Sequence, residues 1–493
     1  IVEKTITSIK RFIIPFLIIF FLFSGIYHAE AASTNVPLHS WVYLCIEKIA
    51  SMGYVQDFMG GILPLTRIEV AQYILGAKNK HDKEGVNPYI EKLLTCLERE
   101  FKEEMDIIRG EAGHINYVKP AGQLYFEHIF LSERKDMENE SGRVYGDDSN
   151  FQSGITTRGE VGNHFAFFIH PEVRVLGNEL GTDVEFIEAY GKFSRSLFEL
   201  EVGRDTMWWG QGRHGSLHLT NNAPAFKFFK LSTTPFVFHW LFKISFFTAE
   251  LEEMRPNPAI TKPKFSGIKL SMKPHPIFEI GITRTFLYED MSDFFNALIA
   301  KDENTINGPG NQQAGFDWRL TLPLKIQPIT LYGEHGGEDE AGGLPSVFAH
   351  LWGIYLPQIL GIEALEFRME YANTHDNEDN KPRAWYTHSA SQEGFSYMYK
   401  NRVMGHHMGT DADDLFLSFS YVPNPALRLS FSFDRERHDI SLVEEKKNEY
   451  TLSVSYWPKE FLRLYGEIQS EKIDSQGVDD NNLHVKMGIA FIF

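Results

Sequence analysis

The chain has 493 residues, and its 66 acidic residues outnumber its 48 basic ones, which gives a net charge of −18 at pH 7. This balance argues against nucleic acid as a partner, because proteins that bind nucleic acid carry basic stripes or patches. Hydrophobic residues make up 43% of the chain, with 40 Phe and 20 Tyr. Beyond the N-terminal segment, however, no apolar run reaches the roughly 18 residues that a membrane helix needs.

The N-terminal 31 residues have the pattern of a secretory signal peptide. Lys4, Lys10 and Arg11 precede an apolar run over 12–26, and Ala29-Glu30-Ala31 has the form of a cleavage site. A single membrane anchor is the alternative, but the apolar run is short for a bilayer span. Export argues against nicotinamide or ATP chemistry. It also leaves two states open for Cys45 and Cys96, which are either paired in a disulfide or buried as free thiols.

Residues 32–112 have a helical apolar period and are predicted to form a small helical domain. The apolar stripes indicate three helices, over 41–52, 66–75 and 87–108. Gly53 and Gly76 are predicted to end the first two helices. Thr66 and Glu69 have the spacing of a capping box at the start of the second helix.

From residue 113 to residue 493 the apolar period changes from 3.6 to 2, which predicts β-strands. Apolar and polar residues alternate over 236–247, 415–421, 427–434 and 451–456. A soluble β-sandwich also alternates. Strand candidates of about nine to twelve residues nevertheless recur, which is the length that a tilted strand needs to cross a bilayer.

Two features near the C-terminus favour a transmembrane barrel over a sandwich. Short turns at 422–426 and 457–461 alternate with longer polar loops at 438–447 and 472–481, an asymmetry typical of outer-membrane barrels. The printed sequence stops at "HVKMGIAFIF", and a strand ending on Phe493 resembles the signal read by the barrel assembly machinery. We therefore predict an all-β outer-membrane barrel of about 18 antiparallel strands.

The stretch "WWGQGRHG" contains Gly210-x-Gly212-x-x-Gly215, the spacing of a dinucleotide fingerprint. That fingerprint needs a buried strand before it, a helix after it, and an acidic residue about 20 residues further on. Here the preceding strand alternates with Glu199 and Glu201, and the following "SLHLTNNAPAF" has no helical period. The region around residue 235 has no carboxylate, so the sequence excludes a nucleotide site.

The same segment is rich in groups that contact sugars, and two roles remain open for it. Aromatic faces can stack on sugar rings, and amide, guanidinium and carboxylate groups can hydrogen-bond hydroxyls. Alternatively, the same side chains pack a loop into the barrel lumen. The candidate polysaccharide-binding residues here are Arg204, Asp205, Trp208, Trp209, Gln211, Arg213, His214, Asn221 and Asn222.

A second polar stretch, "GHHMGTDADD" over 405–414, adds His406, His407 and Asp411 to the candidate residues. Histidine and aspartate are metal ligands, but adjacent histidines do not share a strand face, and no HExxH spacing is present. The sequence therefore predicts neither a metal site nor a cofactor. It also offers no nucleophile elbow or recognisable catalytic set, so we expect no enzymatic activity.

The chain resembles the Wzi family of capsule-assembly outer-membrane proteins. The resemblance rests on "LEVGRDTMWWGQGRHGSLHLTNNAPAF" (200–226), "ALEFRMEYANT" (364–374) and "WYTHSASQEGFSYMYKNRVMGHHMGTDADDLFL" (385–417). It implies an 18-stranded barrel after a periplasmic helical segment. It also implies a lectin-like role, in which the protein attaches capsular or extracellular polysaccharide to the surface of a Gram-negative cell. The family pattern often has Pro where this chain has Gln211.

A porin-like channel for small solutes is the alternative function, since a barrel of this width encloses a lumen. The remaining expected partners are outer-membrane lipid around the wall and the barrel assembly machinery at the last strand. Counting strands back from Phe493 places 204–223 and 376–413 on the same, outer side of the membrane.

Overall fold

The computed structural model describes residues 32–85, 87–111, 116–178, 180–252, 262–289, 294, 298, 310–341, 344–375, 385–387, 395–475 and 477–493. The signal peptide predicted for residues 1–31 lies outside these ranges. In the part of the chain that they cover, no helix combines the length and the apolar character needed to cross a membrane.

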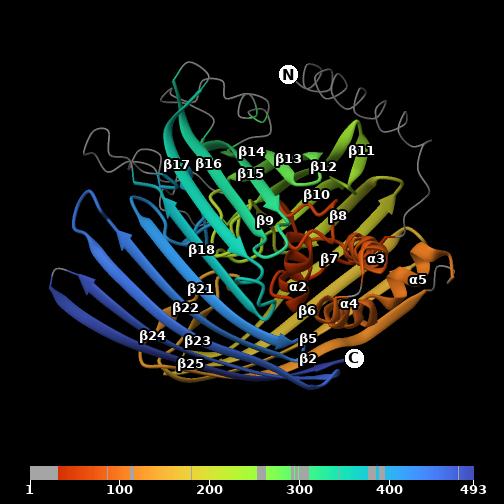
Figure 1. The fold of residues 1–493 in the computed structure, drawn as a ribbon. Coiled ribbons are helices and arrows are strands. Elements are labelled where there is room, and N and C mark those ends of the chain that lie inside the picture. The colour runs from red at the N-terminus through yellow and green to blue at the C-terminus, as the bar shows by residue number, and fades with distance from the viewer. Residues whose placement is uncertain are drawn as a thin grey trace.

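Antiparallel strands close into a barrel (Figure 1). Its strands are β2 (Tyr117–Leu131), β5 (Asp148–Val161), β6 (Phe165–Leu176), β7 (Gly181–Arg195), β8 (Phe198–Arg204), β10 (Lys227–Thr233), β11 (Phe236–Phe238), β12 (Trp240–Glu250), β13 (Lys264–His275), β14 (Phe278–Tyr288), β15 (Gln312–Leu322), β16 (Ile329–Ala341), β17 (Leu344–Leu356), β18 (Leu365–Asn373), β21 (Asp413–Asn424), β22 (Leu427–His438), β23 (Glu445–Lys459), β24 (Leu462–Ser475) and β25 (Val478–Ile492). β2 closes the ring because it pairs with both β25 and β5. β10 and β11 both pair with β12 as one interrupted strand, so the described residues form the 18-stranded wall that the sequence predicts.

The alternating stretch 236–247 is not one strand, as its period suggests, but a hairpin. Phe238 pairs with Trp240, and Phe236 pairs with Phe242. The chain reverses at His239, whose φ of 66° lies in the left-handed region. Because the turn is so tight, apolar and polar residues continue to alternate through it, and the period alone does not reveal the turn. Pro235, which has no N–H to donate, lies in the gap between β10 and β11.

The two faces of the wall differ in polarity. On β12, Lys243 and Ser245 point inward and are buried, whereas Trp240 on the same strand is 42% exposed. On β22, Phe431 is 45% exposed while Asp434 is buried. A polar interior and an apolar exterior are typical of a barrel whose outside contacts lipid. The alternation of polar and apolar residues along each strand therefore determines which side chains face the lumen.

The two ends of the barrel differ in the length of their connections. At one end, which we call the short-turn end, residues 196–197 join β7 to β8 and residues 425–426 join β21 to β22. At the opposite end, the loop end, residues 205–226 join β8 to β10 and residues 374–412 join β18 to β21. Both stretches that carry the candidate residues therefore lie at the same end, as strand counting predicts.

Among the described residues, four helices precede the barrel: α2 (Trp41–Ser51), α3 (Arg67–Glu84), α4 (Pro88–Glu100) and α5 (Lys102–Arg109). The predicted capping box of Thr66 and Glu69 is present at the start of α3. α3 nevertheless runs through Gly76 and ends at Glu84, because one glycine costs a helix only about 1 kcal/mol.

The third predicted helix is divided in two. It breaks at Phe101, whose φ of −109° and ψ of 20° are not helical. This break turns α5 so that Glu104 reaches Arg67 on α3, to which Glu100 also binds.

The helical segment packs into the short-turn end of the barrel, with α2 lying among the strands in Figure 1. Glu47 of α2 accepts hydrogen bonds from Arg319 of β15 at 2.8 Å and from Arg368 of β18 at 2.7 Å. Lys48 of α2 binds Glu366 of β18 at 2.9 Å. α2 is therefore held by paired charges against the inner face of the wall.

Cys45 of α2 and Cys96 of α4 are both free thiols, so the disulfide that the sequence left open is not formed.

Candidate functional site

Residues 205–226, which we call the plug loop, turn from the loop end into the lumen. Trp208 and Trp209 form β9, a two-residue strand that pairs with β1 (Ile62–Leu63) of the helical segment. The Gly210 N–H extends this pairing by donating to the Gly61 carbonyl at 3.1 Å. The helical segment enters from one end and the plug loop from the other, and the two meet inside the barrel.

Two carboxylates of the wall hold the plug loop by its backbone. Glu334 of β16 accepts hydrogen bonds from the Gly212 N–H at 2.8 Å and from the Leu217 N–H at 2.9 Å. Glu370 of β18 accepts from the Arg213 and His214 N–H groups at 2.8 and 3.0 Å. Because carboxylates accept backbone N–H groups strongly, the loop keeps one conformation in the lumen.

The glycines of the apparent fingerprint serve this packing. A Cβ on Gly210, whose φ is +150°, would lie 2.3 Å from a carboxylate oxygen of Glu334. A Cβ on Gly215 would lie 2.2 Å from Nε2 of His406. Both positions need glycine because other side chains approach the backbone closely there.

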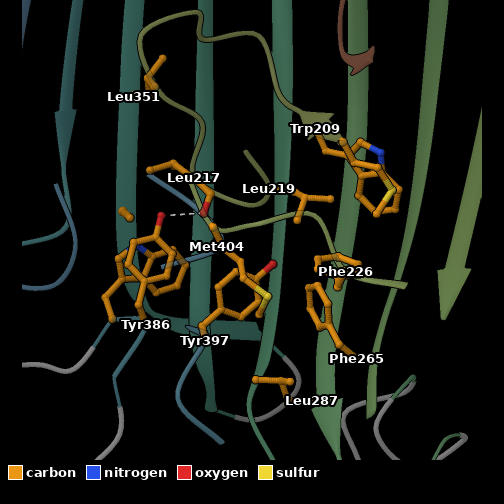
Figure 2. Close-up of a cluster of buried hydrophobic side chains, with 14 of the residues drawn as sticks. Trp209, Leu217, Leu219, Phe226, Phe265, Leu287, Leu351, Tyr386, Tyr397 and Met404 are labelled. Carbon is orange, nitrogen blue, oxygen red and sulfur yellow. Dashed lines mark hydrogen bonds between the residues drawn. The ribbon is translucent and has the colours of Figure 1, made fainter. Parts of the chain in front are cut away.

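The tryptophan pair is buried. Trp208 packs among the helices, and its Nε1–H donates to the Gly212 carbonyl at 2.9 Å. Trp209 lies in the buried lumen cluster drawn in Figure 2, where the Tyr386 hydroxyl donates to the Leu217 carbonyl at 2.7 Å. Trp208 is 6% exposed and Trp209 is 1% exposed. Protein atoms therefore cover the ring faces that sequence analysis offered to a sugar.

The other candidate residues of the plug loop are also tied to protein groups. The Gln211 amide donates to Asp317 of β15 at 2.8 Å, and Asp205 accepts from Asn35 at 2.7 Å. The Asn222 amide donates to the Val403 carbonyl at 3.0 Å. Of the two roles left open by the sequence, packing the loop into the lumen explains these contacts.

Further candidates sit at the edges of the packed region. Arg204 at the end of β8 pairs with Glu185, and Asn221 lines a cavity described below. Asp411 accepts hydrogen bonds from the backbone N–H and hydroxyl of Ser441, each at 2.9 Å. His406 is buried beside Gly215.

A polar cleft of about 480 Å³ opens at the loop end, between the ends of β22–β25 and the segment after β2. Its lining residues are Leu131, Glu133, Arg134, Lys135, Asp136, Glu138, His407, Glu436, His438, Lys447, Gln469, Glu471, Ile473, Asp480, Asn482, Leu483 and His484. We call it the loop-end cleft. Of the twelve candidate residues, His407 is the one on this lining.

The two lysines of the loop-end cleft are paired with carboxylates around it. Lys135 lies on β3 (Lys135–Asp136), which pairs with β4 (Val144–Tyr145), and binds Glu471 at 2.6 Å. Burial would lower the pKa of Lys135, but the carboxylates around it, Glu449 first, outweigh burial and raise that pKa. Lys447 binds Glu436 at 2.7 Å. The lining has six acidic and three basic side chains, so the cleft presents its hydrogen-bonding groups in a net acidic setting.

Two neutral side chains of the cleft keep hydrogen-bonding capacity. Oδ1 of Asn482 and Nε2 of His484 have no hydrogen-bond partner among the described residues. Gln469 lies next to them, with its oxygen 3.3 Å from Nδ1 of His484. Both unpaired atoms are buried, so a ligand in the cleft would reach them through a bridging water or a side-chain movement.

A second cavity of about 460 Å³ lies inside the barrel, beside the helical segment. Inward residues of β2, β22, β23 and β24 line it, together with His39 and Asn221, and it shares no lining residue with the loop-end cleft. The ion pair between Glu140 and Lys486, at 3.1 Å, lies at its loop-end side. The interior cavity and the loop-end cleft are therefore two distinct polar spaces beside the packed plug.

Sequence reasoning missed most of the cleft residues, because their signal is weak. Glu436, Lys447 and Glu471 occupy inward positions of alternating strands, where any wide barrel has polar residues. The short hairpin of β3 and β4, which supplies Lys135, has no period long enough to detect. Only the pairing register shows that these ends meet.

Comparison with known proteins places this architecture in a family. Residues 131–485 match the family model described as capsule assembly protein Wzi. An uncharacterised 55.8 kDa protein from the cps region of Klebsiella pneumoniae is 28% identical over 233 residues, which are 43% of this chain and 45% of that protein. The chain therefore spans less than half the length of this curated relative.

The fold is also that of a solved structure. It is similar, with a TM-score of 0.69 and 18% identity, to the structure of Wzi from Escherichia coli, an outer-membrane protein that is involved in group 1 capsule assembly and is a carbohydrate-binding β-barrel. That likeness covers 95% of this chain and 100% of the other. Because the family model covers well over half of the residues, the chain belongs to the capsule assembly protein Wzi family.

Proposed function

We propose that this protein binds exported capsular or extracellular polysaccharide at the cell surface and anchors it there, without catalysing a reaction. The observation that carries the proposal is the loop-end cleft, a polar space of about 480 Å³ in a barrel of a capsule-assembly family. A volume in the range of 300–1,000 Å³ is typical of small-ligand sites, so a few sugar units fit. The carbohydrate binding of the E. coli relative supports the same function.

The chemistry of the cleft favours recognition by hydrogen bonds. Sugar hydroxyls both donate and accept, and the cleft offers carboxylates, amides, imidazoles and ammonium groups on one lining. Lys135 and Lys447 are already paired with carboxylates, so they are not a bare cationic patch. Among the residues placed by sequence analysis, His407 lies on the cleft lining with its side chain buried, so in this proposal it and the plug-loop residues hold the floor beneath the glycan.

The proposed orientation puts the loop end outside the cell and the helical segment in the periplasm. Short turns on the periplasmic side and long loops on the outer side are the rule for outer-membrane barrels, and here the helices pack at the short-turn end. The apolar exterior of the wall is the proposed contact with outer-membrane lipid. The strand ending at Phe493 is the proposed contact with the barrel assembly machinery.

A small-solute channel is the second candidate, favoured by the interior cavity of about 460 Å³. It requires a path past the plug loop and the helical segment. Conductance measurements, described in the Discussion, separate it from the first candidate.

The proposed function is tested by retention of purified capsular polysaccharide on the detergent-solubilised barrel. We expect the double variant Gln469→Ala/Asn482→Ala to weaken binding about tenfold or more, since each lost hydrogen bond is worth about 0.5–1.5 kcal/mol. Thr182→Ala, an exposed residue of β7 at the same end but outside the cleft, is the matched control. Equal binding by the double variant and the control would show that the polysaccharide does not bind in the cleft.

A further inference from the structure

Two histidines and two aspartates from four separate segments meet below the loop-end cleft. His214 comes from the plug loop, His407 from the segment before β21, Asp414 from β21 and Asp434 from β22. One ligand atom from each lies within 4.8 Å of all the others. The four side chains are brought together only by the fold, since His214 and Asp434 are far apart in sequence.

The spacing of these atoms suits a tetrahedral metal ion. Nε2 of His214 lies 3.0 Å from Oδ2 of Asp434 and 3.4 Å from Oδ2 of Asp414. Nε2 of His407 lies 3.3 Å from the same Asp414 oxygen. Four ligands about 2.0–2.1 Å from a tetrahedral Zn²⁺ lie about 3.3 Å from one another, so little movement is needed.

Several of these ligand atoms make no hydrogen bond with other described residues. Within the part of the chain that is described, neither carboxylate oxygen of Asp414 receives a hydrogen bond, and Nε2 of His407 makes none. The side chains of Asp414 and His407 are 2% and 1% exposed. A buried carboxylate without a hydrogen bond is unfavourable unless a cation or a proton neutralises it. The two aspartates together therefore provide a buried negative site aimed at two imidazoles.

We propose that His214, His407, Asp414 and Asp434 bind one divalent transition-metal ion of the Zn²⁺ type. Imidazole nitrogens together with carboxylate oxygens suit such an ion, whereas Ca²⁺ and Mg²⁺ take oxygen ligands. This inference does not depend on glycan binding, because the ligand set stands on its own geometry.

Neighbouring groups orient the two imidazoles. The ring of His214 stacks on Phe416 of β21, with centroids 3.9 Å apart and planes 9° apart. Nδ1 of His407 lies 3.2 Å from the Asn139 side-chain amide. The same Asn139 amide donates to the His214 carbonyl at 2.6 Å, so it links the backbone of one proposed ligand to the ring of the other.

The ion joins the plug to the cleft. His214 belongs to the plug loop, while His407 is on the cleft lining, as are Glu138 and Glu436, which form a second ligand group with His407 and Asp434. Binding at the four-residue site therefore clamps the plug loop to β21 and β22 and fixes the floor of the cleft.

The test uses the full barrel in detergent, stripped with a chelator and dialysed, and then titrated with ZnCl₂ by calorimetry. We expect one Zn²⁺ per chain, and X-ray absorption at the zinc edge should show four N/O ligands at about 2.0–2.1 Å. Asp414→Asn and His407→Gln should each weaken binding about 100-fold or more, since loss of even an indirect partner costs 10–100-fold.

His484→Gln, another histidine of the cleft lining outside the ligand set, is the matched control and should bind as the wild type does. Heat-dependent mobility in gels establishes that each variant is a folded barrel. The proposal is overturned if the stripped wild type takes up no stoichiometric Zn²⁺. It is also overturned if folded Asp414→Asn binds as tightly as the wild type, or if His484→Gln loses as much affinity as the ligand variants. Polysaccharide retention is measured separately, so failure of either proposal leaves the other intact.

Discussion

The plug loop and the loop-end cleft lie at the same end of one barrel, yet they use polar residues in opposite ways. In the plug loop, polar groups are buried and bound to the wall, as in the contacts of Glu334 and Glu370 with its backbone. In the cleft, charged side chains pair with each other around open space, and Asn482 and His484 keep unused hydrogen-bonding atoms. The plug loop, whose sequence looks most like a binding motif, therefore contributes mainly to packing.

This contrast teaches that residue type alone does not separate binding from packing. Trp209 is suited to stack on a sugar, but its ring lies 5.1 Å from that of Phe247 in the lumen cluster, in an edge-to-face arrangement. What distinguishes a site is access, and access depends on how strand ends and loops meet. The following predictions address that difference, from the largest expected effect to the smallest.

The largest effect is expected in the plug. Trp209→Ala should destabilise the barrel by about 3–5 kcal/mol, the usual cost of emptying a buried aromatic site. The measurement is the temperature at which the folded band is lost in semi-native gels. Asn482→Ala in the cleft should shift that temperature little. Equal shifts for the two variants would contradict the distinction between a packed plug and an open cleft.

A smaller effect is expected when the wall releases the plug loop. The wild-type protein should show no steady conductance in planar bilayers, because the helical segment and the plug loop meet inside the lumen. Glu370→Ala removes the hydrogen bonds from the Arg213 and His214 N–H groups, each worth about 0.5–1.5 kcal/mol, and should produce fluctuating openings. Glu445→Ala at the start of β23 is the control. A steady open current in the wild type would instead favour the channel.

The strands were predictable because the alternation of apolar and polar residues shows both where a strand lies and which of its side chains face the lumen. The count near 18 and the shared end of 205–226 and 374–412 follow from it. Helix starts were also predictable, since Thr66 and Glu69 cap locally. The break at Phe101 and the turn at His239 were not predictable, because neither interrupts the apolar period. The break at Phe101, for example, goes with tertiary contacts of Arg67 with Glu100 and Glu104.

The candidate site was only partly predictable. The sequence pointed to His407, which lies on the cleft and in the proposed metal site, and to His214 in the plug loop, but no local pattern shows that the fold brings both to Asp414 and Asp434. Adjacent histidines at 406–407 argued against a metal because they cannot share a strand face. In the structure they lie in a loop, where that constraint does not hold. Nε2 of both rings approaches Oδ2 of Asp414, at 3.3 Å for His407 and 3.8 Å for His406, and His407 belongs to the ligand group.

The central claim is that polysaccharide binds in the loop-end cleft and not at the tryptophan pair of the plug. The most direct test compares the dissociation constant of purified polysaccharide for Gln469→Ala/Asn482→Ala with that for Trp208→Leu, which keeps apolar bulk but removes the aromatic face. The account predicts weaker binding by the cleft variant, as above, and wild-type binding by folded Trp208→Leu. Strong loss in Trp208→Leu with wild-type binding by the cleft variant would contradict it.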